Sequence, residues 1–247
     1  MNLKHNSGMS MKNKELPFIK DMFDKIAPRY DFLNRTLSLH RDVYWRRETI
    51  ASLKLSTKKQ PHLLDVACGT GDVSIEAVSQ LGKKIIVTGV DFSENMLQLA
   101  NKKIKKANIN TITFMAGNAL SLPFDDTMFD AVTIAFGIRN IADRKKALTE
   151  FLRCLKPGGV LGILELSTPE NRFFKSLYMF YFLKVLPFIG GLFSKNLAAY
   201  QYLPDSVINF PDAETFTDQI ESSGFCDVTY KKMTLGIVTL YTGVKKE

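Results

Sequence analysis

The fold is decided by the stretch Leu63-Leu64-Asp65-Val66-Ala67-Cys68-Gly69-Thr70-Gly71-Asp72-Val73-Ser74. Its apolar run is short and two glycines interrupt it, so the pattern predicts a buried strand, a tight loop and then a helix that Asp72 caps. Gly69 and Gly71 carry no side chain where a ligand could approach the backbone, and the helix N-terminus offers free amide groups. The stretch therefore predicts a nucleotide-binding turn. A plain strand-turn-helix, in which the glycines serve geometry alone, is the alternative.

A second acidic residue separates the candidate ligands. Residues 85–90 predict another short strand, which ends at Asp91, about 20 residues beyond the glycines. A carboxylate in that position can accept hydrogen bonds from both hydroxyls of a ribose. We therefore expect a ligand that contains adenosine, with Asp91 among its contacts.

The charge of the loop favours one adenosine compound over another. Asp65 precedes the loop and Asp72 follows it, and their carboxylates would repel a pyrophosphate but suit a cationic ligand such as a sulfonium. The spacing of the small residues, Gly69-x-Gly71-x-x-Ser74, also fits a dinucleotide fingerprint only loosely. Both features favour S-adenosylmethionine over NAD as the cofactor.

Length and composition restrict the class of protein. With 247 residues, 45% of them hydrophobic, the chain can bury one substantial core, so we expect a single α/β domain with an insertion. The 33 basic and 25 acidic residues leave a net charge of +8, carried largely in short lysine clusters. Such clusters are more typical of solvated helix ends than of a nucleic-acid surface, so we expect no nucleic-acid partner. A weak attraction to anionic lipid head groups is left open.

Cysteine and histidine usage indicates the compartment. The three cysteines and three histidines lack the spacing of a disulfide framework or a zinc site. We therefore expect no metal and a reducing, cytoplasmic compartment. The N-terminus carries lysines but no apolar core that could serve as a signal peptide, so export is not expected.

The N-terminal part precedes the first strand. Residues 1–15 are polar and predicted to be disordered, and residues 16–55 are predicted to form a helical cover. Apolar residues at helical spacing predict a first helix that ends at Pro28, a turn at 30–34 and a second amphipathic helix over about 37–53. We expect these helices either to lie across the strand ends or to shield an edge of the sheet.

Two later strands lead to further candidate residues. Strand 112–116 is followed by Asn118-Ala119, which we expect beside the adenine or in a structural turn. Strand 129–135 is dense in apolar residues, as expected of a central strand covered on both faces, and is followed by Arg139-Asn140. Because ligands bind at the carboxyl ends of such strands, this second pair should face a substrate. A surface ion pair is the alternative for the arginine.

An apolar insertion is predicted over residues 172–205. Its aromatic run, 173–193, is broken by lysines, a proline and a glycine pair, so its unbroken apolar runs are shorter than the roughly 20 residues that span a bilayer. We expect either a buried core helix or an apolar lid that lines a lipid-binding pocket and touches the membrane surface. Tyr200-Gln201-Tyr202-Leu203 follows this run and is expected to supply phenolic hydroxyls to the same pocket.

The C-terminal part completes the predicted sheet. A helix over 211–223 is followed by strands over 226–233 and 236–244, whose short connection predicts an antiparallel hairpin. Parallel strands finished by such a hairpin indicate an α/β fold with a seven-stranded, mostly parallel, doubly wound sheet. This Rossmann-like layout is that of the class I S-adenosylmethionine-dependent methyltransferases. We expect residues 16–247 to form this single domain.

Several segments together resemble the menaquinone/ubiquinone biosynthesis C-methyltransferases. The resemblance covers about residues 16–245, and two of its segments are specific to that family, whereas the glycine loop fits any methyltransferase of this class. The two specific segments are Met22–Asp31 and Phe136–Asn140. The others are Asp65–Asp72, Asp91, Asn118-Ala119, Lys156–Gly159 and Tyr200–Leu203.

The resemblance implies an activity and a set of site residues. The implied reaction moves a methyl group from S-adenosylmethionine to a ring carbon of a prenylated quinol, demethylmenaquinol foremost and the ubiquinone precursor second. Thr70, Asp91 and Asn118-Ala119 are implied at the cofactor, beside Asp65, Gly69 and Gly71 of the loop. Arg139 is implied as a base or as a residue that orients the quinol.

The chemistry of the reaction agrees with these residue types. A quinol carbon becomes nucleophilic when a ring hydroxyl loses its proton, so the site needs a group that stabilises the phenolate. A guanidinium at Arg139 can do so without titrating, while a tyrosine or a water relays the proton. The catalytic candidates are therefore Arg139, Asn140 and Tyr200.

Two other functions are weighed against this one. An RNA methyltransferase would usually carry an Asn/Asp-Pro-Pro-Tyr/Phe turn after the fourth strand, where this chain has Phe136–Asn140. A non-catalytic partner in a quinone-biosynthesis assembly would not need the intact loop and Asp91. The sequence leaves open the quinone, its tail length, the general base, membrane affinity and oligomeric state, with a homodimer as one option.

Overall fold

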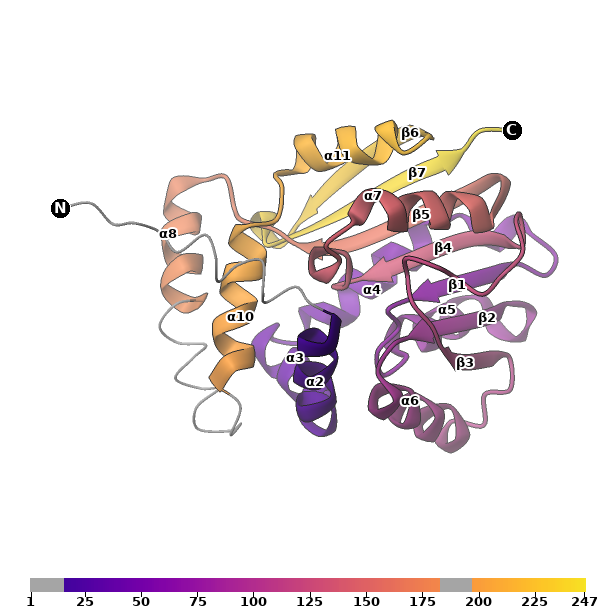
Figure 1. The fold of residues 1–247 in the computed structure, drawn as a ribbon, viewed down its shortest axis with the longest axis horizontal. Coiled ribbons are helices and arrows are strands. Elements are labelled where there is room, and N and C mark those ends of the chain that lie inside the picture. The colour runs from indigo at the N-terminus through magenta and orange to yellow at the C-terminus, as the bar shows by residue number, and fades with distance from the viewer. Residues whose placement is uncertain (1–15, 183–196) are drawn as a thin grey trace.

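Within residues 16–182 and 197–247, which the computed structural model describes, seven strands form one sheet in the order β3-β2-β1-β4-β5-β7-β6 (Figure 1). The strands are β1 (His62–Val66), β2 (Ile86–Asp91), β3 (Ile112–Ala116), β4 (Phe129–Ala135), β5 (Leu155–Leu166), β6 (Phe225–Met233) and β7 (Val238–Lys245). Strands β1 to β5 pair in parallel, and β7 runs antiparallel to β5 and β6. The predicted mostly parallel, doubly wound sheet with its C-terminal hairpin is confirmed.

Helices cover both faces of this sheet. In chain order, the α-helices of the described residues are α2 (Leu16–Ile26), α3 (Tyr30–Leu37), α4 (Arg41–Ser52), α5 (Asp72–Leu81), α6 (Glu94–Lys106), α7 (Arg144–Cys154), α8 (Arg172–Phe180), α10 (Leu197–Ile208) and α11 (Ala213–Ser222). In the part of the chain that the structure describes, no helix has both the length and the apolarity to cross a membrane.

The core is divided by the sheet into two apolar layers. One layer packs α7 and α11 against the strands through Phe151 and Phe216, and the other packs α4 and α5 through Leu53 and Ala77. Figure 1 shows α7 in front of the sheet, with α4 and α5 behind it. Residues 129–134 of β4 are buried throughout, as predicted for a central strand covered on both faces.

The N-terminal helices differ from the prediction in one respect. Helix α2 ends before Pro28, as expected, but residues 30–34 begin helix α3 and do not form a turn. Pro28 stands at the start of the short 3-10 helix Ala27–Arg29, where its missing N–H is not needed, so the chain continues directly into α3. Helix α4 does not join this cover, since it packs on a face of the sheet against α5 and β5.

The predicted insertion is described in part. Helix α8 begins after Asn171, whose side chain accepts hydrogen bonds from the Phe173 and Phe174 N–H groups. Helix α10 lies beside α8 in Figure 1. The middle of the segment, 183–196, lies outside the described residues, as does the predicted disordered segment 1–15.

The loop after β1 turns in a way that only partly follows the prediction. Gly71, not Asp72, is the N-cap residue of α5, with φ +81°. A β-carbon there would lie 2.5 Å from Phe114 Cζ, so this glycine is required by the left-handed backbone and by packing. Asp72 is the first helical residue, and its carboxylate pairs with Lys103 and Arg46.

Asp65 ends up in the interior between β1, β4 and α5. Its carboxylate accepts hydrogen bonds from Ser74 Oγ at 2.6 Å and Thr133 Oγ1 at 3.0 Å, and its side chain is fully enclosed. Burial raises the pKa of Asp65 to about 6, because desolvation outweighs the two hydroxyl donors. This group therefore binds a proton in the folded state at pH values where the unfolded chain has released it.

The raised pKa predicts how stability depends on pH. As the pH rises from the ordinary Asp pKa of 3.8 to beyond the folded value of about 6, the ionisation of Asp65 lowers the free energy of unfolding by up to about 3 kcal/mol. We expect Asp65→Asn to remove this loss, so that its free energy of unfolding, relative to the natural chain, rises by about 3 kcal/mol from pH 4 to pH 7. Urea unfolding of both proteins across this range measures the difference, and parallel curves would contradict the assignment.

Candidate active site

Two cavities lie side by side at the carboxyl ends of the parallel strands. The larger has a volume of about 570 Å³ and the smaller about 270 Å³. Phe23 of α2, Tyr30 of α3 and Phe136 after β4 line both of them, so the two spaces share one wall. The helices α2 and α3 therefore lie over the strand ends, so the first of the two predicted N-terminal helices has the expected placement, whereas the second, α4, packs on a face of the sheet.

The smaller cavity brings together residues that follow four strands. Gly69 follows β1, Asp91 ends β2, Asn118 and Ala119 follow β3, and Asn140 follows β4. This edge is where strand order reverses between β1 and β4, the position at which doubly wound sheets bind ligands.

Asp91 is the charged group on this wall. Its Oδ2 accepts a hydrogen bond from the Gly69 N–H at 2.8 Å, and its Oδ1 accepts one from the Ser93 N–H at 2.8 Å. Burial raises the pKa of Asp91, although these amide donors oppose the shift. Each carboxylate oxygen keeps a lone pair with which to accept a hydrogen bond from a ligand hydroxyl.

Gly69 provides a direct test of whether a ligand fits. The nearest atom to a β-carbon built on Gly69 would be Tyr30 Cε1, 4.0 Å away, so the glycine borders open space that a side chain would fill. Asn118 is fixed because its Oδ1 accepts the Leu120 N–H, so its amide nitrogen can donate to a base. The wall thus offers acceptors for ribose hydroxyls and a donor for adenine, as S-adenosylmethionine requires.

Asp65, Thr70 and Gly71 do not line the smaller cavity. Asp65 is enclosed behind the strand, and Asp72 is neutralised by Lys103 and Arg46. The expectation that these two acids give the loop a negative rim was therefore wrong, because both carboxylates find partners within the fold. Among the described residues that line the smaller cavity, Asp91 is the only acid.

Thr70 instead connects the loop to the N-terminal helices. Its hydroxyl donates to Asp31 of α3 and accepts from Lys103 of α6. Lys103 also pairs with Asp31 and Asp72, and Ser93 Oγ donates to Asp24 of α2. These contacts hold α2 and α3 against the glycine loop.

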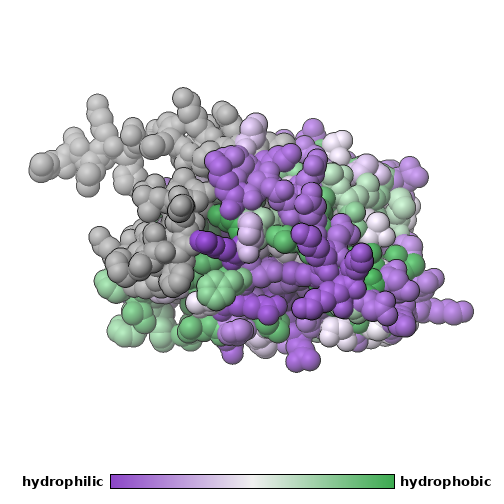
Figure 2. Space-filling model, turned by 90° about the horizontal axis from the view of Figure 1, so that it is seen from below, coloured by the Kyte–Doolittle hydropathy of each residue, from purple (hydrophilic) through white to green (hydrophobic). Residues whose placement is uncertain are grey.

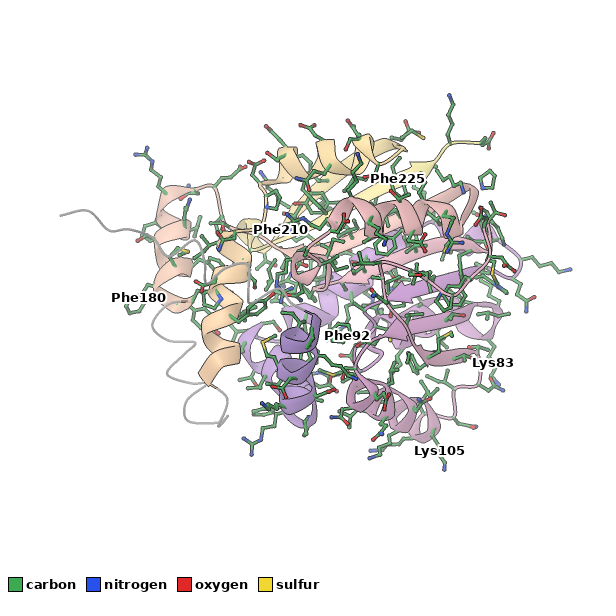
Figure 3. The ribbon with its side chains drawn as sticks, in the orientation of Figure 1. Lys83, Phe92, Lys105, Phe180, Phe210 and Phe225 are labelled. Carbon is green, nitrogen blue, oxygen red and sulfur yellow. The ribbon has the colours of Figure 1, made fainter. Side chains whose placement is uncertain are left out.

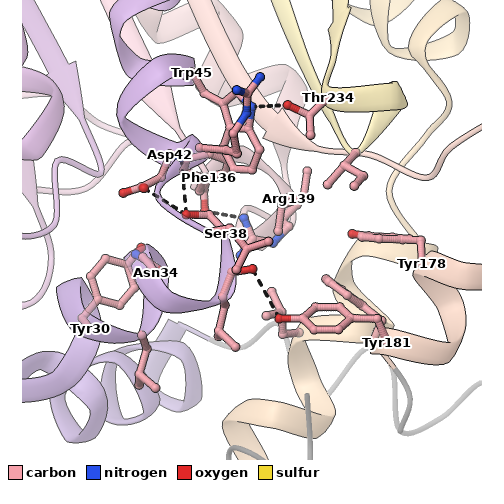
Figure 4. A pocket seen from close by; sticks show the side chains of 18 of the residues that line it. Tyr30, Asn34, Ser38, Asp42, Trp45, Phe136, Arg139, Tyr178, Tyr181 and Thr234 are labelled. Carbon is pink, nitrogen blue, oxygen red and sulfur yellow. Dashed lines mark hydrogen bonds between the residues drawn. The ribbon is translucent and has the colours of Figure 1, made fainter. Parts of the chain in front are cut away.

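The larger cavity is mostly apolar and contains Arg139. Met22, Leu33, Trp45 and Tyr178 are among the buried side chains on its wall. The polar groups of the wall largely pair with one another, as Figure 4 shows for Trp45 with Thr234 and for Ser38 with Asp42.

Arg139 is buried and paired, which differs from the surface ion pair considered as its alternative. Its Nη1 donates to Glu165 Oε1 at 2.6 Å and to the Phe136 carbonyl, and its Nε donates to Ser206 Oγ. Burial lowers the pKa of Arg139, but the charge and hydrogen bond of Glu165, together with Tyr30 and Tyr202, outweigh it, so the pKa is raised and the group stays protonated. Its Nη2 bonds to nothing in the part of the chain that the structure describes and is available to a ligand.

Asn140 connects the two cavities through Tyr202, which belongs to the segment Tyr200–Leu203 that was expected to supply phenolic hydroxyls but was not the catalytic candidate within it. Asn140 lines the smaller cavity, and its Oδ1 accepts a hydrogen bond at 2.9 Å from the Oη of Tyr202, which lines the larger one. Tyr200 was the predicted phenol. It belongs to α10, but its side chain lies outside what the structure describes. The helical spacing of residues 200 and 202 was the signal that only one of them could face Asn140.

Comparison with solved structures agrees with the fold. The [4+2]-cyclase SpnF matches with a TM-score of 0.68 at 17% identity, over 92% of this chain and 95% of that chain. A methyltransferase of Thermotoga maritima, described as S-adenosylmethionine-dependent, matches with a TM-score of 0.62 at 19% identity, over 92% of this chain and all of that chain. At such identities the likeness concerns the fold.

Comparison with known sequences is more specific. The sequence model of the ubiE/COQ5 methyltransferase family matches residues 9–245. The ubiquinone/menaquinone biosynthesis C-methyltransferase UbiE of Geobacter sulfurreducens is 50% identical over 92% of this chain and 88% of its own length. The demethylmenaquinone methyltransferase of Chlorobaculum tepidum is 43% identical over 98% of both chains. The chain therefore belongs to the ubiE/COQ5 methyltransferase family and is an S-adenosylmethionine-dependent C-methyltransferase.

Proposed function

We propose that this enzyme methylates a ring carbon of a prenylated quinol, with demethylmenaquinol as the first candidate substrate and the ubiquinone precursor as the second. The observation that carries the proposal is the mostly apolar cavity of about 570 Å³ that shares a wall with the cofactor cavity and is lined by the buried Arg139. A quinol ring with an apolar tail matches such a space, because the tail needs apolar walls and the ring oxygens need donors. The names of the two relatives point to the same class of substrate.

The residues of the chain have separate tasks in this reaction. When bound, S-adenosylmethionine supplies a methyl group attached to a positively charged sulfur. Asp91 and Asn118 would hold its adenosine part, and the apolar walls exclude water from the reacting groups. The ring hydroxyl passes its proton to solvent by way of a water molecule, and Arg139 Nη2 donates a hydrogen bond to the phenolate oxygen so formed, which makes the ring carbon nucleophilic. Once that carbon has gained the methyl group, it releases its own hydrogen as a proton and the ring is aromatic again. Since Arg139 stays protonated, it acts as a donor and not as a base.

Asp91 supplies a first test. We expect Asp91→Asn to bind S-adenosylmethionine at least about tenfold more weakly, because the variant loses the charge that strengthens hydrogen bonds from hydroxyls. Titration calorimetry measures the dissociation constant. Asp130→Asn is the matched control. Asp130 is as buried as Asp91, at 6% exposed, but it lies near the N-terminal end of β4, away from the cavities, and pairs with Lys58 and Lys156. Equal affinities for Asp91→Asn and the natural chain would refute the role of Asp91.

Arg139 supplies a second test. Alanine would leave Glu165 charged and unpaired in the interior, so Arg139→Lys is the better change, since it keeps a charge beside Glu165 but removes the Nη2 donor. We expect kcat with a demethylated quinol to fall at least about a hundredfold and the dissociation constant for S-adenosylmethionine to stay the same. Arg153→Lys, at an arginine paired with Glu150 away from both cavities, is the control. Normal turnover in Arg139→Lys would remove Arg139 from the mechanism.

The mouth of the larger cavity faces an apolar surface, which bears on where the substrate comes from. Leu39, Leu177 and Leu235 line the cavity and are also largely exposed. Phe173 and Phe180 extend this surface along α8 and are 73% and 61% exposed. Figure 2 shows hydrophobic residues gathered at the left end of the molecule, the end at which α8 lies in Figure 1.

Cations accompany this surface. Arg172 and Lys175 belong to α8, which contains no acidic residue, and Arg35 and Arg41 lie to either side of Leu39 in the sequence. Exposed apolar side chains with neighbouring cations suit the surface of an anionic bilayer. We therefore assign the enzyme to the cytoplasm, at the inner face of the membrane, where a prenyl tail passes from lipid into the cavity without entering water.

Vesicle binding tests this assignment. We expect the Phe173→Ser/Phe180→Ser variant to bind vesicles of phosphatidylglycerol and phosphatidylcholine at least about tenfold more weakly than the natural chain, because two aromatic rings no longer enter the interface. Met128→Ser, at an exposed methionine where β4 begins, is the control. Figure 3 places Phe180 far from Lys83 and Lys105, so alanine at those two lysines should not alter binding. Unchanged vesicle binding by the double variant would exclude this face.

A further inference from the structure

Tyr178 of α8 has a hydroxyl without a partner. Its side chain lines the larger cavity and is 6% exposed, and its Oη has no hydrogen-bond partner among the described residues. A hydroxyl removed from water without a replacement bond destabilises the fold. Phenylalanine would fill the same space without that cost, so the structure alone does not account for the hydroxyl.

The phenols near Tyr178 are in a different situation. Tyr181 Oη donates to the Leu37 carbonyl at 3.3 Å, and Tyr202 Oη donates to Asn140 Oδ1 at 2.9 Å. The apolar side chains packed around Tyr178 include Val207 and Leu166, and its Oη reaches no acceptor among the described residues. Its partner must therefore come from something that enters the cavity.

The position of the Tyr178 ring is fixed by packing. Its ring lies 4.4 Å from that of Phe182, centroid to centroid, and α8 is anchored at its start by the Asn171 cap. Figure 4 shows the Tyr178 hydroxyl directed into the space beside Arg139. Burial raises the pKa of Tyr178, and the Arg139 charge opposes this, which also indicates that the two groups are close. The hydroxyl therefore stays protonated and can donate.

Two hydrogen-bond donors without a partner among the described residues, Arg139 Nη2 and Tyr178 Oη, thus belong to residues that line the larger cavity. A neutral quinol oxygen needs only one donor, whereas the phenolate oxygen formed on loss of the proton is best stabilised by two. We propose that Tyr178 is a catalytic residue that donates a hydrogen bond to the quinol ring oxygen that loses its proton, beside the bond from Arg139. This inference rests on the proposed quinol substrate.

Tyr178→Phe tests the proposal because it removes one oxygen atom and nothing else. With a short-chain prenylated naphthoquinol that lacks the ring methyl, we expect kcat to fall about tenfold. The acid limb of the pH profile of kcat should move up by about one pH unit, because the bound quinol loses its proton less readily. The dissociation constant for S-adenosylmethionine should not change, and the thermal midpoint should not fall, since no bond within the protein is lost.

Tyr241→Phe is the matched control. Tyr241 is also a buried phenol, but it packs in the core between β7 and α11, away from both cavities. We expect the pH profile of kcat to stay unchanged in this variant. A Tyr178→Phe enzyme with the natural pH profile would overturn the proposal, and so would one that merely unfolds at lower temperature with that profile unchanged.

A failure of the proposed function can be told apart from a failure of this inference. If the natural enzyme methylates none of the demethylated quinols, the proposed function fails. If the natural enzyme methylates such a quinol and Tyr178→Phe keeps the natural pH profile of kcat, the Tyr178 assignment fails while the proposed function stands.

Discussion

The buried ion pair between Arg139 and Glu165 is the interaction on which the site depends. Glu165 lies near the end of β5, and its carboxylate accepts hydrogen bonds from both Nη1 and the backbone N–H of Arg139. The pair therefore ties the turn after β4 to the neighbouring strand. A lone charge could not remain in an apolar cavity, but a paired one can, because each partner stabilises the charged form of the other. The same pair decides which atoms of Arg139 remain free, and leaves Nη2 facing the cavity.

This pairing also limits what Arg139 can do. Because Glu165 balances its charge, the pair attracts an anion less strongly than a free guanidinium would, so a second donor has more to contribute. The surroundings make each donor effective, since an apolar cavity lacks the water that would compete for a phenolate oxygen. The apolar wall needed for a prenyl tail therefore also strengthens the hydrogen bonds at the ring.

The sequence was sufficient for what depends on short-range patterns. The strands, the glycine loop, the C-terminal hairpin and Asp91 at the end of β2 could be predicted, because each follows from the pattern of residues within a short stretch. The ionic partners could not. Glu165 lies 26 residues from Arg139, and Lys103 lies 31 residues from Asp72, so the charges that neutralise these groups become visible only when the sheet is assembled. The predicted negative rim failed for that reason. The sequence also could not decide which tyrosine of Tyr200–Leu203 faces Asn140, because facing directions on α10 depend on its packing.

The N-terminal helices couple the two halves of the site. Phe23 and Tyr30 belong to the walls of both cavities, and Asp31 and Asp24 hold the same helices to the glycine loop and to the start of α6. Any movement of α2 and α3 that opens the smaller cavity must therefore also remove part of the wall of the larger one. The space for the acceptor is complete only when these helices are closed over the loop. Because the wall is shared, the enclosure of the cofactor and the completion of the acceptor cavity require the same position of these helices.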